Sequence, residues 1–160
     1  MNDLPAVCNL GTKKNGKGYK ETWICYKFHL DCIDGDIPIS AILSSASLDD
    51  SQVSIPLAQM SSEQVTNLYD LMDSAYDSPE IHAFSKSLGH CPLIDNNPRR
   101  GEKIPMDPAT KTRFAERRSA ERVTYLKANY KGRNIRGKGA SKEMTHLMFG
   151  VVSITAMQIF

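Results

Sequence analysis

The sequence lacks the patterns of a disulfide scaffold, a zinc site, a secreted protein and a membrane protein. Its four cysteines, Cys8, Cys25, Cys32 and Cys91, form no Cys-x-x-Cys pair and have no histidines at zinc-site spacing. Free thiols in a reducing cytoplasm are the simplest interpretation. The first thirty residues contain no apolar core of a secretory signal, and the most apolar stretch, His146–Phe160, is shorter than the roughly 20 residues that cross a membrane. We therefore expect a cytoplasmic protein with no membrane association, in which this stretch is a buried helix.

Internal repeats and low-complexity tracts are also absent from the 160 residues. The composition, 41% hydrophobic and 24% charged, is that of an ordinary soluble globular domain. A chain of this length buries roughly two-thirds of the surface that its unfolded form exposes. One domain with a single core is expected.

Positive charge is concentrated in one part of the chain. Residues 98–138 hold 13 Lys and Arg against four acids, a local charge of +9 in a chain whose net charge is +2, so the remainder carries −7. Clustered Lys and Arg release counterions when they meet phosphates, which favours a polyanionic partner for this segment. A solvated charged helix is the alternative.

Residues 22–47 have the pattern of a β-hairpin. Apolar and polar side chains alternate over Ile24–Asp31 and again over Ile37–Ser47, and Asp34–Asp36 has the composition of a hairpin turn. Lys27 and His29, on the polar side of the first strand, are interpreted as surface residues. The preceding segment, Gly11–Gly18, is rich in Gly, Asn and Lys and predicts an exposed, mobile loop.

The remainder of the chain alternates short strands with helices. Pro79 suits the first position of a helix, and Gly89 suits its end. The expected strands are Val65–Asp73 and His90–Asp95, and the expected helices are Asp49–Met60, Ser78–Leu88, Asp107–Tyr130 and Ser141–Phe160. This order indicates an α/β fold with a sheet and flanking helices.

Two acids stand out in this arrangement. Asp73 ends an apolar strand, where a carboxylate can reach a metal, and Glu121 lies in the basic segment 48 residues later. Two separated acids amid basic residues suggest metal-dependent chemistry on nucleic acid. On a helix, Phe114, Arg117 and Glu121 would share one stripe. The alternative for Arg117 and Glu121 is a surface ion pair worth about 0.3 to 0.5 kcal/mol.

Five segments, in this order, resemble the catalytic domain of DDE transposases of bacterial insertion sequences: Tyr26–His29, Ile37–Gln52, Leu71–Ser78, His90–Arg99 and Glu121–Val123. The resemblance covers most of residues 11–160. It implies a ribonuclease H-like mixed sheet with flanking helices. It also implies three acids that hold Mg²⁺ or Mn²⁺ for DNA strand cleavage and strand transfer at transposon ends.

By this resemblance Asp73 matches the second metal-binding acid and Glu121 the third. The same resemblance places residues 22–160 in the catalytic domain and leaves residues 1–21 as an N-terminal remnant with the Lys-rich loop. It allows a homo-oligomer in the DNA complex. The residues expected to contact DNA are Arg99, Arg100, Arg117, Arg122 and Lys127.

The chain departs from the family pattern in three places. The family's first acid lies on a strand before the Lys-rich loop, where this chain offers only Asp3 and Asn9, so we expect an N-terminally truncated copy that lacks the first, central strand. Phe114 stands where the family has Tyr. Lys127 follows Glu121 by six residues where the family has seven, which rotates it by about 100°.

Other interpretations remain open at this point. Asp50 matches a family position, although a helix-capping or hairpin role is favoured over catalysis. The chain as a whole could be a non-catalytic DNA-binding protein that competes with intact transposase. A ribonuclease H-like nuclease of another type would share the metal chemistry.

Overall fold

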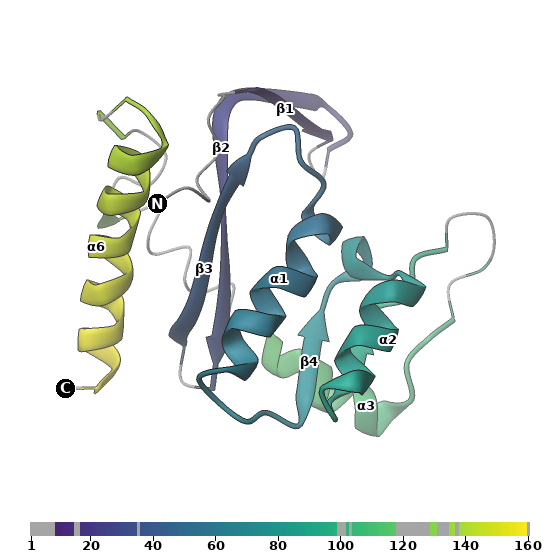
Figure 1. Cartoon of the computed structure of the whole chain (residues 1–160). Coiled ribbons are helices and arrows are strands. Elements are labelled where there is room, and N and C mark those ends of the chain that lie inside the picture. The colour runs from purple at the N-terminus through teal and green to yellow at the C-terminus, as the bar shows by residue number, and fades with distance from the viewer. Residues whose placement is uncertain are drawn as a thin grey trace.

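The computed structural model describes residues 9–14, 17–34, 36–98, 102, 104–117, 129–130, 135–136 and 138–159 (Figure 1). Over these residues it is a mixed α/β structure with two small sheets. The strands are β1 (Asn9–Lys14), β2 (Lys20–Ile33), β3 (Ile37–Ser45), β4 (Tyr69–Met72) and β5 (Cys91–Ile94). The α-helices are α1 (Asp50–Ser62), α2 (Pro79–Ser87), α3 (Pro108–Phe114) and α6 (Ala140–Ile159), and two single turns of 3₁₀ helix are η1 (Ser74–Tyr76) and η2 (Ala115–Arg117).

The first sheet is antiparallel in the order β1-β2-β3. The predicted hairpin is present, and β2 pairs with β3 from Tyr26↔Ser45 to Ile33↔Ile37. The register shifts between Asp31↔Ser40 and Cys32↔Pro38, which leaves Ile39 as the extra residue of a bulge. Pro38 has no backbone N–H to donate to the hydrogen bonds between strands, and a bulge next to it accommodates this lack.

The predicted loop Gly11–Gly18 is wrong over its first half. Residues 9–14 form β1 and pair with β2 from Asn9↔Cys25 to Lys14↔Lys20. Gly, Asn and Lys are poor strand formers, but the first half of β2 offers a free edge, and pairing with it overrides local preference. Gly11 packs under the ring of Trp23, where a side chain would not fit.

Two helices cover the hairpin from opposite sides (Figure 1). α6 packs on β3 and buries Val151 and Ile154 against Phe28 and Leu30 of β2. α1 lies on the other face, which explains why the neighbouring residues Leu43 and Ser44 are both buried. The polar side of β2 therefore faces α1 rather than solvent, and His29 is half-buried.

Local signals explain where α1 and α2 begin. Asp49 caps α1 in a capping box with Gln52, and Ser78 caps α2, in which Pro79 takes the first turn. Gly89 follows α2 with a φ of 82°, a conformation in which glycine carries no steric penalty.

The second sheet consists of β4 and β5, which pair in parallel from Tyr69↔Cys91 to Met72↔Ile94. β4 is shorter than the predicted strand 65–73: residues 65–68 lead into it outside the strand, although the Leu68 backbone oxygen accepts a hydrogen bond of 2.8 Å from the N–H of Cys91. The chain then turns through η1 and returns along α2 to β5. The predicted order of strand, turn, helix and strand is confirmed.

The predicted helix 107–130 is present in part. Asp107 caps α3, which ends at Phe114, and the tighter η2 follows through Arg117. Residues 118–128 of that prediction lie outside the described part of the chain.

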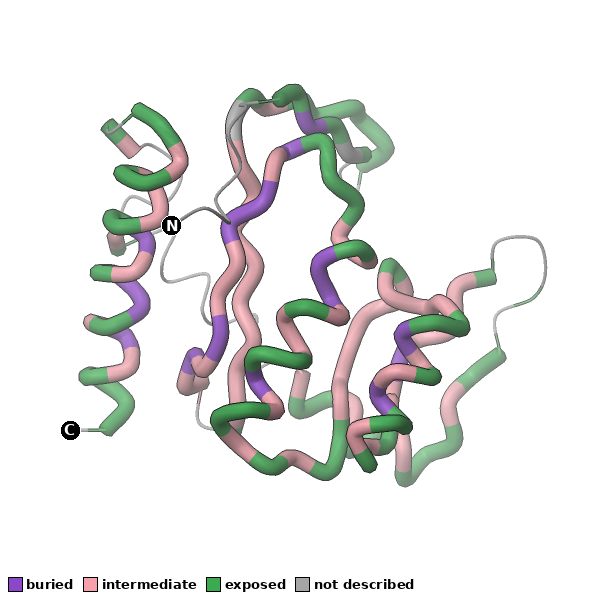
Figure 2. Tube along the Cα trace, in the orientation of Figure 1, coloured by how far each residue is buried: buried purple, intermediate pink, exposed green. Residues whose placement is uncertain are grey.

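The predicted C-terminal helix is present as α6, but it is buried on one side only (Figure 2). Phe149 and Val152 face outward and are 71% and 61% exposed. Of the helices described, none has the length and apolar character needed to span a membrane.

Candidate functional site

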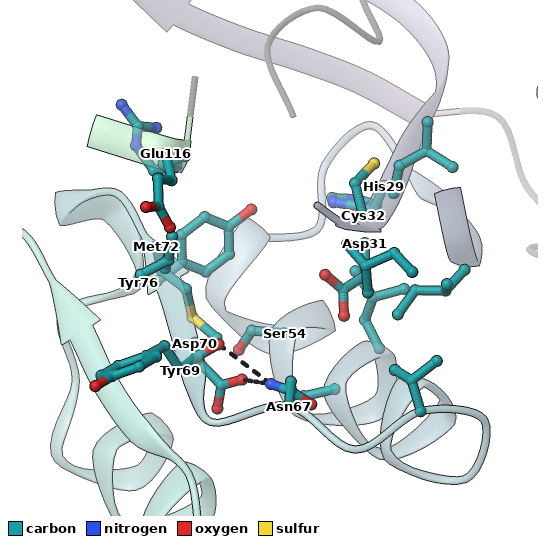
Figure 3. Close-up of a pocket in the computed structure, with 18 of the residues that line it drawn as sticks. His29, Asp31, Cys32, Ser54, Asn67, Tyr69, Asp70, Met72, Tyr76 and Glu116 are labelled. Carbon is teal, nitrogen blue, oxygen red and sulfur yellow. Dashed lines mark hydrogen bonds between the residues drawn. The ribbon is translucent and has the colours of Figure 1, made fainter. Parts of the chain in front are cut away.

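A pocket of about 820 Å³ lies between β2 and β4 (Figure 3). One wall comes from the end of β2, including His29, Asp31 and Cys32, and the other from residues 65–73 around β4. Side chains of α1 and residues of α3 and η2 complete the lining. The pocket thus brings together segments that are far apart in the sequence.

Asp73 lies at the carboxyl end of β4, as the sequence predicts. Its Oδ1 accepts a hydrogen bond of 2.9 Å from the backbone N–H of Ala75, so the side chain caps η1. Its Oδ2 lies 3.9 Å from Nη1 of Arg117, and the Asp73 side chain is 49% exposed. The carboxylate is accessible from the pocket and has a cation beside it.

Arg117 is held in place by the helix that precedes it. Its guanidinium lies over the ring of Phe114, 5.3 Å from the centroid. Arg113, one turn earlier, lies 5.0 Å from the centroid of the Tyr69 ring and 3.2 Å from Glu116. The Arg113–Tyr69 contact brings α3 close to β4, and η2 also contacts that strand. Phe114 and Arg117 lie on the same side of the segment, as predicted.

A second ion pair lies near the start of α1, and its acid, Asp50, lines the pocket. Nζ of Lys27 donates to Oδ1 of Asp50 at 2.9 Å and to the backbone oxygen of Leu48 at 2.6 Å. Asp49 caps α1, and Asp50 is its first residue. Asp50 thus connects α1 to β2 through Lys27. Burial, followed by the charges of Asp50 and Asp73, raises the pKa of the Tyr76 phenol to about 12. Tyr76 is therefore a neutral hydrogen-bonding group at the pocket.

Asp70 is the centre of a largely buried polar network. Its carboxylate is 10% exposed and accepts hydrogen bonds from Ser85 at 2.5 Å and Asn67 at 2.7 Å, with Nδ1 of His90 at 3.1 Å. Together these contacts connect β4 to α2 and to the start of β5. A buried carboxylate with several donors is a stable arrangement, because its desolvation is compensated.

Asp31 faces Asp70 from the opposite wall. Its Oδ2 accepts a hydrogen bond of 2.5 Å from the hydroxyl of Ser61 in α1. Burial raises the pKa of Asp31, and the nearby Asp70 charge adds to the rise, while the Ser61 hydrogen bond opposes it. Burial also lowers the pKa of His29, whose Nε2 lies 2.8 Å from the Ser44 hydroxyl. The β2 wall therefore disfavours charge on both residues.

The structure brings two of the predicted site residues together, Asp73 and Arg117. The other predicted site residues, Arg99, Arg100, Glu121, Arg122 and Lys127, lie outside the described part of the chain. Within the described ranges no group of three His, Cys, Asp or Glu side chains is arranged to hold a metal ion. The described residues thus supply one carboxylate of the predicted metal-binding pair.

Sequence reasoning missed Asp31 and Asp70. Asp70 could have been found, because a carboxylate inside an apolar strand requires partners. Asp31 gave no such signal, because it lies on the polar side of an alternating strand, where a carboxylate is expected. Only the packing of α1 makes that side an interior surface.

No family model matches the chain, and neither a curated protein nor a solved structure matches it.

Proposed function

We propose that this chain is the catalytic domain of a DDE-type transposase, acting on DNA with Mg²⁺ or Mn²⁺, in which Asp73 and Glu121 hold the ion. The observation that carries the proposal is the position of Asp73 at the carboxyl end of β4, with Arg117 3.9 Å from its carboxylate. An acid beside an arginine suits a phosphodiester backbone, because the arginine can bind a phosphate oxygen while the acid holds a cation.

The donor chemistry of Asp73 fits the proposed ion. Carboxylate oxygens are the ligands that Mg²⁺ prefers, and the Asp73 carboxylate is half-exposed at the pocket. When bound, the ion supplies charge neutralisation at the reacting phosphate. The chain's own contribution is to orient the side chains. The Ala75 N–H fixes the Asp73 carboxylate, and the Phe114 ring supports Arg117 in a position to contact the DNA backbone.

A second candidate is a DNA-binding protein without catalytic activity. It is favoured by the engagement of Asp73 as a helix cap and ion-pair partner, since both contacts have a structural role. In this case the basic segment 98–138 would bind DNA, and the two acids would be dispensable.

A nicking assay separates the two candidates. The substrate is a supercoiled plasmid carrying the DNA that flanks the gene, incubated with Mg²⁺, Mn²⁺ or EDTA. Asp73→Asn keeps the cap acceptor but removes the charge, and Glu116→Gln is the matched acidic control on η2. Metal-dependent nicking that Asp73→Asn and Glu121→Gln abolish, and Glu116→Gln retains, supports the transposase. DNA binding without nicking by the folded protein, unchanged in both variants, supports the second candidate.

The DNA contacts have a test of their own in the salt dependence of binding. Replacing Arg99, Arg100, Arg117 and Arg122 together by Gln should weaken binding and flatten the slope of log K against log salt concentration. Each lost phosphate contact removes about 0.9 from that slope. An unchanged slope, measured by fluorescence anisotropy, would show that these arginines do not bind the backbone.

A further inference from the structure

The two-stranded ribbon formed by β1 and the first half of β2 has one face that is fixed by the fold. Gly11 lies so close to the Trp23 ring and to the backbone oxygen of Ala46 that a Cβ would not fit. Nδ2 of Asn9 donates to the hydroxyl of Ser47 at 3.2 Å. These contacts join the ribbon to the end of β3 and to the turn that follows it. The opposite face of the ribbon therefore points outward.

This outward face carries three cross-strand pairs. Side chains alternate between the two faces of a strand, and residues directly opposite each other share a face. The register of β1 and β2 thus places on the outward face the pairs Leu10↔Ile24, Thr12↔Thr22 and Lys14↔Lys20. All six residues are exposed (Figure 2). Toward the turn, the face changes from apolar through hydroxyl-bearing to cationic.

The cationic pair is an unfavourable arrangement for the isolated ribbon. Lys14 and Lys20 are directly opposite each other, and like charges in such positions are destabilising. Glu21 is the single acid of residues 9–24, but it is opposite Lys13 in the register and belongs to the other face. An anion bound by both Lys14 and Lys20 would remove the repulsion between them.

The positive charge of the ribbon is local. Residues 9–24 contain four lysines and one acid, a charge of +3. The residues outside both this segment and the basic segment 98–138 carry −10. The lysines of the ribbon therefore do not follow from a generally basic composition, and their clustering favours a polyanion as the ligand of this face.

Among polyanions, duplex DNA fits the outward face best. Lys and Thr are both common donors to the phosphate and sugar oxygens of DNA, and a two-stranded ribbon fits a major groove of about 12 Å. Along the strand, Thr12 and Lys14 are separated by roughly 7 Å, so the donors form a row on each strand. A membrane surface would use apolar side chains next to the lysines, whereas here the threonine pair separates the two kinds.

We propose that the outward face of the β1–β2 ribbon binds duplex DNA, with Lys14 and Lys20 on backbone phosphates and Thr12 and Thr22 as further donors to the backbone. Such contacts position the protein on the duplex and carry no sequence information. The inference uses no residue of the basic segment and neither Asp73 nor Arg117. It therefore stands or falls separately from the proposed nicking chemistry.

Acetylation of lysines in the folded full chain maps the contact directly. The reaction is followed by mass spectrometry with and without a short DNA duplex of arbitrary sequence, in EDTA. Bound duplex should slow acetylation of Lys14 and Lys20 several-fold, and Lys86, an exposed lysine in the last turn of α2, should react at an unchanged rate. Unchanged rates at Lys14 and Lys20, or no binding of the duplex, would overturn the proposal.

The salt dependence of binding gives a second test. Replacing Lys14 and Lys20 together by Gln should reduce the slope of log K against log salt concentration by about 1.8, since each phosphate contact contributes about 0.9. Replacing the exposed Lys86 and Lys142 by Gln changes the net charge equally and should leave the slope unaltered. Unshifted Trp23 emission would verify that the ribbon of the first variant is folded. Equal slopes in the two variants would refute the contact.

The slope change has a control for the proposed catalytic function. It should be the same in wild type and in an Asp73→Asn background, because the ribbon requires no divalent ion. Nicking that fails while the slope change persists would remove the catalytic proposal and leave the ribbon contact. The reverse result, nicking with no effect of the ribbon variant on DNA binding, would remove only the ribbon contact.

Two further results would assign the lysines to another role and overturn the proposal. One is unchanged DNA binding by the ribbon variant together with lost binding to phosphatidylserine vesicles, which would identify an anionic membrane as the partner. The other is unchanged DNA binding together with new oligomers in sedimentation velocity. In that case the lysines would serve to protect the edge strand β1 from pairing with other chains.

Discussion

Asp31 shows how one residue can belong to the polar side of a strand and still be enclosed. It lies on β2 beneath α1, where the Ser61 hydroxyl is its hydrogen-bond donor. Ionised carboxylates lose hydration on burial, and the Asp70 charge adds repulsion. At neutral pH this residue therefore lowers the stability of the fold.

Asp31→Asn should stabilise the protein at pH 7 by about 1 kcal/mol, because it removes the buried charge and keeps an acceptor for Ser61. The corresponding rise in Tm is about 2 to 4 °C. The folded-state pKa of Asp31 is raised above the value of 3.8, so as pH falls through the folded-state pKa the wild-type folded state takes up a proton and the penalty declines. The advantage of the variant should therefore begin to shrink as pH falls through the folded-state pKa and vanish below the ordinary value of 3.8.

Thermal unfolding at several pH values checks this expectation. Asp34→Asn in the exposed hairpin turn is the matched control and should change stability by less than about 0.5 kcal/mol at every pH. A constant difference between Asp31→Asn and wild type across the acidic range would contradict the explanation.

At the same scale, local sequence patterns predicted which residues lie at the ends of strands and helices. They did not predict which residues of different elements lie close together. Asp73 follows β4, and the Asp49–Asp50 pair begins α1, both as predicted from local patterns. The proximity of Asp73 and Arg117 depends on how α3 docks on β4, through Arg113 and Tyr69. No spacing in the chain contains that information.

At the scale of elements, β1 is the clearest difference from expectation. Its composition is that of a loop, yet six of its residues pair with β2. Gly11 is required there because a Cβ would lie 2.5 Å from the Trp23 ring and 2.8 Å from the backbone oxygen of Ala46. The glycine that indicated a loop is thus the residue that lets the strand approach its neighbours.

Gly11→Ala should destabilise the protein by about 1 to 3 kcal/mol, because the backbone of Ala46 cannot move aside as a side chain could. Trp23 is the single tryptophan of the chain, so its fluorescence reports on this contact directly. A red shift of emission at low denaturant is expected in the variant. Thr12→Ala, on the exposed side of the same strand, should leave the spectrum unchanged.

The helices were predicted with more success because their ends carry specific signals. Asp49, Ser78 and Asp107 each accept backbone hydrogen bonds at the start of a helix. The apolar stretch His146–Phe160 also predicted α6, but as a buried helix, whereas one of its faces is exposed. Which side of a helix is covered depends on the neighbours that the whole fold supplies.

At the scale of the whole molecule, α6 is held to the hairpin by a small core. Val151 and Ile154 are 7% and 6% exposed and contact Phe28, Leu30 and Cys32 of β2. The outward face of α6 contributes little to this attachment. The energy of docking is therefore concentrated in a few side chains.

Ile154→Ala should lower the free energy of unfolding by about 2 to 5 kcal/mol, through lost apolar contact and the cavity left behind. Val152→Ala, on the exposed face, should cost less than about 0.5 kcal/mol. Urea unfolding followed by circular dichroism measures both. Equal losses in the two variants would show that α6 is not oriented as described.

The α/β class and the order of elements could be predicted from the sequence, whereas the division into two sheets could not. Strand patterns indicate where a chain is extended but not which strand is its neighbour. β2 and β4 both have a second edge without a partner among the described strands, and that fact follows only from their positions in space.

The separation of the two sheets has a consequence for how the molecule opens. Because no described strand ladder connects them, β4, β5 and α2 can unfold as a unit while the hairpin stays intact, a subglobal opening with its own free energy. Native-state hydrogen exchange in low denaturant should then yield two groups of amides with different opening energies. The Ile154→Ala substitution should lower the energy of the hairpin group and leave that of residues 69–94 nearly unaltered; a single shared energy would mean that the two halves open as one.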